Sequence, residues 1–134
     1  MKKFICLSIV FYLFMSCTSY DVTSTERLVI LPVTEVAFPA TFAENEVTEI
    51  PIKYALPDGC HRYYDLYYNK DSNTRTVAIV AVQAKQGACT QSVTTMTQIL
   101  KFKPALAGTY TFKFYKGKDA TGLDAFYEFQ AVVN

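Results

Sequence analysis

The sequence predicts an all-β protein: a sandwich of about seven to eight antiparallel strands after a cleaved N-terminal signal helix. Three observations favour this fold class. Apolar and polar residues alternate with a period of two in several segments, and no segment beyond the signal shows the 3.6-residue period of an amphipathic helix. Clusters of Pro, Gly, Asn and Asp separate these segments, as turns do. The remaining length suits one domain with a single core.

Residues 1–16 have the order of a secretion signal. Two lysines precede an apolar run that ends at Met15, and this run is shorter than the roughly 20 residues needed to span a bilayer. Ser16 and Cys17 follow. We therefore expect residues 1–16 to be a lipoprotein signal peptide, with an ordinary signal peptide or a buried N-terminal helix as alternatives.

The end of this run, Phe14 to Cys17, resembles the lipobox of bacterial lipoproteins. Phe14 and Met15 stand where leucine and a small residue are usual, and this looser form is similar to that of Bacteroidota. The resemblance implies that Cys17 carries the lipid and begins the mature chain. It also implies a location in the cell envelope, as an outer-membrane lipoprotein facing the periplasm or the surface.

Charge and motifs exclude several functional classes. The chain holds 13 basic and 12 acidic residues, and loss of the two signal lysines would leave it nearly neutral, so nucleic acid is not an expected partner. No phosphate-binding loop, nucleophile elbow or metal-ligand spacing occurs. We therefore expect no cofactor, no metal and no enzymatic activity.

Cys60 and Cys89 are the cysteines that remain once Cys6 leaves with the signal and Cys17 takes the lipid. Two cysteines in an oxidising compartment predict one disulfide, with buried free thiols as the alternative. A zinc site is disfavoured because His61 is the only histidine.

The first half of the domain begins after a tether. Residues 17–27 are rich in Ser and Thr and nearly free of apolar residues, so they cannot add to a core, and the sandwich domain is expected over residues 28–134. Leu28 to Leu31 is a short β-rich run closed by Pro32, which favours an edge strand. Val47 to Ala55 alternates, and its expected core face is Ile50, Ile52 and Tyr54.

The next strand, which starts at His61, is rich in tyrosine and supplies the candidate binding face. Period two divides it into two rows. We expect one row to face the core and the other to be exposed, and the exposed candidates are His61, Tyr63, Asp65 and Tyr67. Such a row could stack on a glycan or anchor a protein partner, or could be ordinary cross-strand packing. Catalysis by His61 and Asp65 would also need a nucleophile or metal, which nothing in the sequence identifies.

The second half of the domain supplies the central strand and the last strands. Val77 to Val82 is unbroken apolar sequence, which predicts burial on both faces. Further strands are expected over Val93 to Lys103, from Thr109 onwards and over Asp124 to Val133, with a hairpin loop over Lys116 to Gly122.

The segment Leu106 to Phe114 carries a more specific motif. Tyr110, Phe112 and Phe114 share one face, and the run Leu-x-x-Gly-x-Tyr resembles the tyrosine corner of immunoglobulin-like sandwiches. That resemblance implies a buried Tyr110 whose hydroxyl bonds the backbone of the preceding turn. The chain has no tryptophan, and its two cysteines do not have the immunoglobulin placement, so the disulfide is expected outside the core.

As a whole, the sequence resembles small Bacteroidota lipoproteins of unknown function with an immunoglobulin-like domain. This resemblance implies a lipid-anchored binding or structural module without catalytic activity, which presents an aromatic strand face or loops to a glycan or protein. One alternative is a protease-inhibitor-like module that inserts the loop over Lys116 to Gly122 into a protease cleft. A less favoured alternative is a hydrolase that uses His61 and Asp65.

Overall fold

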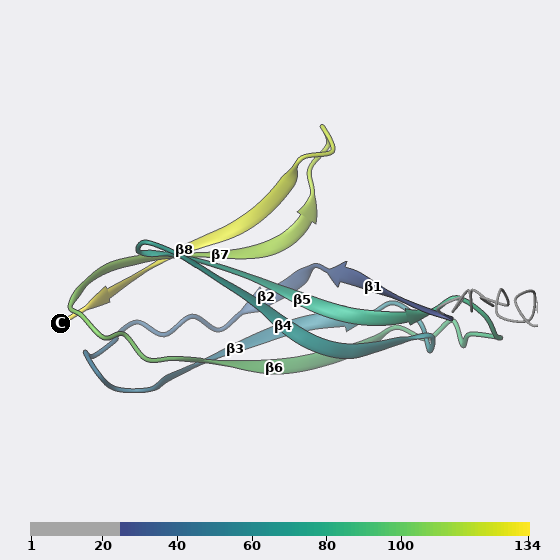
Figure 1. Ribbon diagram of the computed structural model, residues 1–134, viewed down its shortest axis with the longest axis horizontal. Helices are drawn as coiled ribbons and strands as arrows, with labels where there is room; N and C mark the ends of the chain where they lie inside the picture. Colours follow the sequence, from purple (N-terminus) through teal and green to yellow (C-terminus); the bar gives the residue numbers. More distant parts are fainter. Residues whose placement is uncertain (1–24) are drawn as a thin grey trace, which may run out of the picture.

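The computed structural model describes residues 25–134, so the predicted signal, Cys17 and most of the predicted tether lie outside the described residues (Figure 1). The described part is all-β, without a helix, as predicted. Eight strands are formed: β1 (Glu26–Leu31), β2 (Val33–Val36), β3 (Thr48–Leu56), β4 (His61–Asp71), β5 (Thr74–Ala84), β6 (Thr94–Phe102), β7 (Gly108–Lys118) and β8 (Asp124–Val133). Within these residues, no helix is long and apolar enough to cross a membrane.

Two sheets face each other. The larger contains β1, β4, β5, β7 and β8, and the smaller contains β2, β3 and β6. Pro32 separates β1 from β2, and the chain changes sheet there. A break between strands at this position suits proline, because its backbone nitrogen has no hydrogen to donate to a neighbouring strand. The architecture is consistent with the predicted immunoglobulin-like sandwich.

The central strand is β5, as its apolar sequence predicts. It pairs with β4 along one side and with both β1 and β7 along the other. All pairings between the eight described strands are antiparallel except β5 with β7, which is parallel over four positions. The prediction of a wholly antiparallel sandwich therefore needs this one correction, because β6 crosses to the other sheet between β5 and β7.

The core lies between the sheets and is formed by the alternating rows that the sequence predicts. Ile50, Ile52 and Tyr54 are at most 1% exposed. Phe112 and Phe114 are fully buried, and Phe38 packs on both of them and stacks on Phe129 with ring centroids 4.8 Å apart. Aromatic burial of this kind dominates the stability of a small core.

The tyrosine corner is present. Tyr110 is buried, and its hydroxyl donates a hydrogen bond of 2.9 Å to the carbonyl of Leu106. The partner lies in the turn before β7, which is where the resemblance places it. This bond fixes the entry of the chain into β7.

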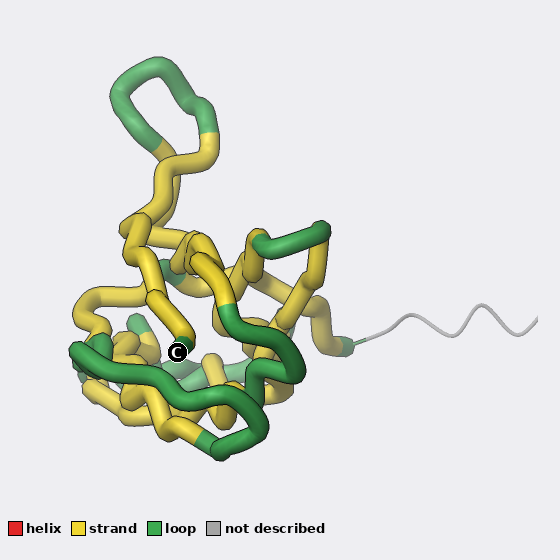
Figure 2. Tube along the Cα trace, turned by 90° about the vertical axis from the view of Figure 1, so that its left-hand side faces the viewer, coloured by secondary structure: helices red, strands yellow, loops and turns green. Residues whose placement is uncertain are grey.

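The end of β7 and the start of β8 leave the sandwich. Figures 1 and 2 show these two segments rising away from the other elements as a two-stranded hairpin. A register shift between Tyr115 and Gly117 accompanies this departure, as expected for a bulge that bends a strand. The hairpin thus stands over the outer face of the larger sheet.

Candidate functional site

The predicted binding row of β4 is divided between the two faces of the sheet. The pairing of β4 with β5 shifts register between Tyr63 and Asp65. A bulge of one residue moves every later side chain to the opposite face. His61 and Tyr63 therefore point inward, whereas Asp65 and Tyr67 point outward. The expectation that all four share one exposed face is wrong for this reason.

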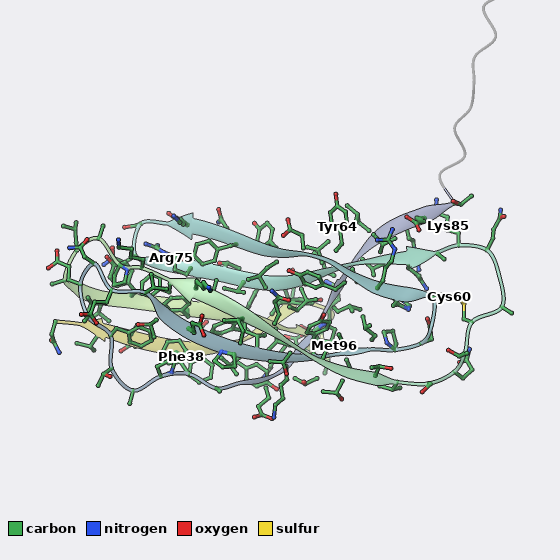
Figure 3. The ribbon with its side chains drawn as sticks, turned by 90° about the horizontal axis from the view of Figure 1, so that it is seen from below. Phe38, Cys60, Tyr64, Arg75, Lys85 and Met96 are labelled. Atoms are coloured by element: carbon green, nitrogen blue, oxygen red, sulfur yellow. A yellow bond between two sulfur atoms is a disulfide. The ribbon has the colours of Figure 1, made fainter. Side chains whose placement is uncertain are left out.

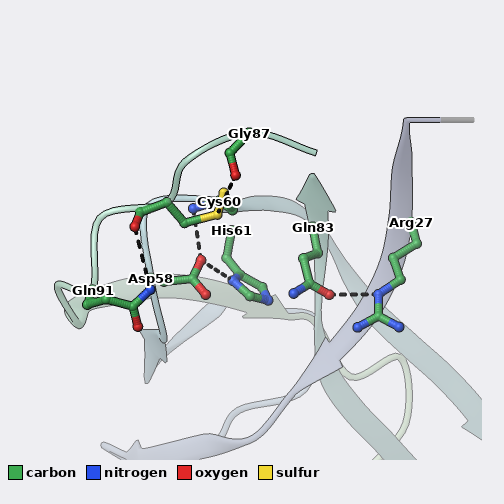
Figure 4. A network of polar contacts seen from close by, with 8 residues as sticks. Arg27, Asp58, Cys60, His61, Gln83, Gly87 and Gln91 are labelled. Carbon is green, nitrogen blue, oxygen red and sulfur yellow. Dashed lines mark hydrogen bonds and ion pairs between the residues drawn. A yellow bond between two sulfur atoms is a disulfide. The ribbon is translucent and has the colours of Figure 1, made fainter. Parts of the chain in front are cut away.

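His61 lies at the end of the sandwich and is bonded to Asp58, not to Asp65. The Nδ1 atom of His61 is 2.7 Å from Oδ1 of Asp58, and the histidine side chain is 8% exposed (Figure 4). The same carboxylate oxygen accepts a hydrogen bond from the backbone N–H of Cys60. The hydrogen bond from the His61 side chain is the main cause of a lowered pKa for Asp58.

This geometry does not bring together His61 and Asp65, the two residues named for the hydrolase alternative. Asp65 lies on the outer face, and its carboxylate accepts a hydrogen bond from the backbone N–H of Leu66. The two members of the expected acid/base pair therefore lie on opposite faces of β4. The His61–Asp58 pair instead organises the turn before β4.

The disulfide between Cys60 and Cys89 is formed, with Cα atoms 5.3 Å apart. It lies at one end of the sandwich, outside the inter-sheet core, as predicted (Figure 3). The turn and the Cys89 loop approach closely at Gly59, whose N–H donates to the carbonyl of Thr90 and where a Cβ atom would meet the Thr90 hydroxyl. Asp58 Oδ and both sulfurs lie within 4.8 Å of one another, but the sulfurs are bonded to each other rather than free to act as thiolate ligands.

Tyr67 and its neighbours form an apolar groove on the outer face of the larger sheet. The groove has a volume of about 510 Å³, within the range of ligand-binding clefts. Five strands contribute its lining: Ile30, Tyr67, Thr76, Ala78, Tyr115, Lys118, Asp124 and Phe126. We refer to this feature as the hairpin groove.

The projecting hairpin forms one wall of the hairpin groove. Tyr115 and Phe126 are paired across β7 and β8, with ring centroids 5.9 Å apart in an edge-to-face arrangement. At the outer end, Lys118 Nζ is 2.7 Å from Asp124 Oδ1, and this bond raises the pKa of Lys118. The wall is therefore aromatic near the sheet and charged near the tip.

The surface beside the hairpin groove is also apolar. Leu28 and Ile30 of β1 are 61% and 58% exposed, and Tyr64 and Tyr67 of β4 are 57% and 48% exposed. These four residues form the apolar border. On β5, the outward residues between them are Val80 and Val82, which pair with Ile30 and Leu28. The hairpin groove and the apolar border together form a continuous exposed apolar surface.

Sequence reasoning found Tyr67 and missed the rest of the hairpin groove. One signal was available: Tyr115 continues the outward row of Thr109, Thr111 and Lys113 on β7. The other residues come from strands far apart in the sequence, and only the fold brings them together.

Comparison with known proteins identifies a family for this domain. No curated protein and no solved structure is significantly similar to the chain. The family model described as the ORF11 beta-sandwich domain matches residues 50–122, which is more than half of the chain. The match extends from β3 into the β7–β8 loop, and it agrees with the two-sheet architecture. The chain belongs to the ORF11 beta-sandwich domain family.

Proposed function

We propose that this protein is a non-catalytic binding module of the cell envelope, held by a lipid at Cys17, which contacts another protein through the hairpin groove. The observation that carries the proposal is the exposed apolar surface formed by the groove and its border. Tyr67, Tyr115 and Phe126 supply three aromatic rings at one site. Exposed aromatic side chains at a concave site are typical anchors of protein interfaces.

A protein partner is favoured over a glycan by the aliphatic border. Leu28 and Ile30 offer no hydrogen-bonding groups, and each is more than half exposed. A sugar would leave its hydroxyl groups unpaired against such a surface, which costs free energy. An apolar side chain of a partner would fill the groove, and its neighbouring residues would cover the border.

The hairpin tip supports a second candidate, the protease-inhibitor-like module. The β7–β8 loop projects from the sandwich (Figure 2). Asp119 organises it, because its carboxylate accepts hydrogen bonds from the N–H groups of Thr121 and Leu123 and from the Thr121 hydroxyl. These bonds also lower the pKa of Asp119. A loop held in one conformation on a rigid scaffold suits insertion into a cleft.

The first test is site-specific photocrosslinking in cells that express the protein. A photoreactive phenylalanine at position 67 should give a discrete crosslinked species with another protein. The same amino acid at Thr97, which is exposed on the smaller sheet, is the matched control and should give none. Phe126→Ser should weaken the crosslink from position 67, because it removes one wall of the groove.

Three outcomes would overturn the proposal. Equal crosslinking from positions 67 and 97 would mean that the groove has no specific partner. A glycan that binds the purified protein and is lost with Phe126→Ser, without any protein crosslink, would replace the protein partner by a sugar. Tight, stoichiometric inhibition of a protease that is abolished by Asp119→Ala, with no crosslink from position 67, would replace the proposal by the inhibitor candidate.

A further inference from the structure

A second hollow opens at the end of the sandwich opposite the disulfide. It has a volume of about 470 Å³ and lies where the β4–β5 turn, the end of β6 and the start of β7 meet. Figure 3 shows Arg75 at this end and Cys60 at the other. Tyr68, Phe102 and Tyr110 form its inner surface, and Ser72 and Asn73 lie at its rim. We refer to it as the end pocket.

The end pocket is lined by four basic residues and by no acidic residue. These are Lys70, Arg75, Lys101 and Lys103. Lys101 lies 3.5 Å from a carboxylate oxygen of Glu49. The other three form no ion pair with any carboxylate of residues 25–134. In contrast, lysines such as Lys53 and Lys113 elsewhere on the surface are paired with glutamates.

Arg75 occupies the core-facing row of β5, in step with Val77 and Ile79. Its Nη1 atom donates hydrogen bonds of 2.7 and 2.9 Å to the carbonyls of Ser72 and Thr74. Its guanidinium carbon lies 5.0 Å from the centroid of the Tyr110 ring. These contacts hold the guanidinium in one place, as cation–π contacts and carbonyl acceptors do.

The charge of Arg75 has no counterion in the described structure. Its Nε atom is buried and has no hydrogen-bond partner within the described residues. Next to it, Tyr68 is withdrawn from water, and this burial raises the pKa of its hydroxyl even though Arg75 acts in the opposite direction. A partly buried cation without an anion is costly. Three lysines around it add to the positive potential, which attracts anions.

We propose that the end pocket binds an anionic sugar, meaning a sugar unit that bears a carboxylate, sulfate or phosphate group. The lysines would receive the charged group, and the Arg75 guanidinium would add to the positive potential there, since its Nη1 atom is already bonded to carbonyls and its Nε atom is buried. The pocket is larger than a bare inorganic ion would fill. The hydroxyl of Ser72 and the amide of Asn73 offer polar partners for sugar hydroxyls.

The apolar part of the pocket is consistent with a ring as the body of the ligand. Pro104 and Leu106, which belong to the connection between β6 and β7, also line the pocket. A sugar ring has apolar C–H faces as well as hydroxyl groups, so it can contact both kinds of wall. This inference is independent of the hairpin groove, which lies on the outer face of the sheet.

The test is a calorimetric titration of the purified full-length protein in detergent with four compounds. Glucuronate and glucose 6-phosphate should bind, whereas glucose and inorganic phosphate should bind at least tenfold more weakly. Lys70→Gln combined with Lys103→Gln should weaken binding about tenfold, because each removes a charge close to the ligand. Raising the salt concentration should weaken binding as well.

The matched control is Lys85→Gln combined with Lys116→Gln. It removes the same charge, and these lysines also form no ion pair in the described residues. Lys116 lies over the Tyr127 ring as Lys70 lies over Tyr68, at 5.2 and 5.7 Å. The control should bind like the parent.

Three results would overturn the proposal. If neither acidic sugar binds at millimolar concentrations, the pocket does not bind an anionic sugar. If inorganic phosphate binds as tightly as glucose 6-phosphate, the sugar is not recognised. If the control variant loses as much affinity as the pocket variant, the effect comes from net charge. Loss of this site would leave crosslinking at the hairpin groove unchanged, so the two proposals fail separately.

Discussion

Tyr110→Phe removes one hydroxyl group from the tyrosine corner and leaves the rest of the side chain in place. The ring is 6% exposed and packs edge-to-face against Phe102 at 5.3 Å, so the buried apolar area is retained. What is lost is the 2.9 Å hydrogen bond to the Leu106 carbonyl. A single hydrogen bond of this kind contributes about 1 kcal/mol net, and more where the abandoned carbonyl stays out of water.

Urea denaturation measures this loss directly. With a slope of about 1 to 2 kcal/mol/M, a change of about 1 kcal/mol shifts the midpoint by roughly 0.5 to 1 M, without a change of slope. The control is Tyr63→Phe. Tyr63 also faces inward and lies 6.1 Å from the Tyr54 ring. Its hydroxyl makes no hydrogen bond to another described residue, so its midpoint should stay within about 0.3 M of the parent.

Equal midpoints for Tyr110→Phe and the parent would refute this reasoning, because the bond would then contribute nothing. An equal loss in both variants would also refute it. The effect would then come from the removal of any tyrosine hydroxyl at the core, and the tyrosine corner would have no special role.

Three further predictions concern the turn before β4 and the anchor. Alanine at both Cys60 and Cys89 should lower the free energy of unfolding by about 3 to 4 kcal/mol, because the bridge joins residues 29 apart; an unchanged urea midpoint would contradict this. The His61 hydrogen bond lowers the pKa of Asp58 in the folded state. The ionised Asp58 therefore stabilises the folded protein fully above about pH 4, and this stabilisation is lost as the pH falls through the folded-state pKa. Asp58→Asn should therefore lose less stability than the parent as the pH falls below about 4, and equal losses in denaturation curves of the two proteins would contradict this prediction. Cys17→Ala should move the protein from the membrane fraction to the soluble fraction, and unchanged partitioning would exclude lipidation there.

The strands and most core rows could be predicted from the sequence, because alternation records which face of a strand is buried. The row of Ile50, Ile52 and Tyr54 and the row of Tyr110, Phe112 and Phe114 are both confirmed. Alternation fails where a bulge intervenes. The shift after Tyr63 leaves no mark in residue type, so alternation alone predicts one continuous row along β4.

The two hollows could not be predicted for a different reason. The hairpin groove needs the outward curl of β7 and β8, and the end pocket needs Arg75 of β5 to meet Lys103 and Tyr110. These contacts join segments that are far apart in the chain, and period-two patterns carry no information about them. The position of Arg75 could be predicted locally, because Arg75 belongs to the same inward-facing row of β5 as Val77.

The strand β5 pairs with both β1 and β7 along one edge, and this arrangement has a mechanical consequence. The strand β1 begins at the disulfide end, and the C-terminal residue lies at the opposite end of the long axis (Figure 1). A force that pulls these two ends apart would pass from β1 to β5, then to β7 and β8. At each step it would load the hydrogen bonds side by side, in shear, instead of opening them one after another. The β5–β7 pairing is the shortest on this path, with four positions against six for β1–β5. Resistance to stretching would therefore depend on a few parallel bonds beside Phe112 and Phe114.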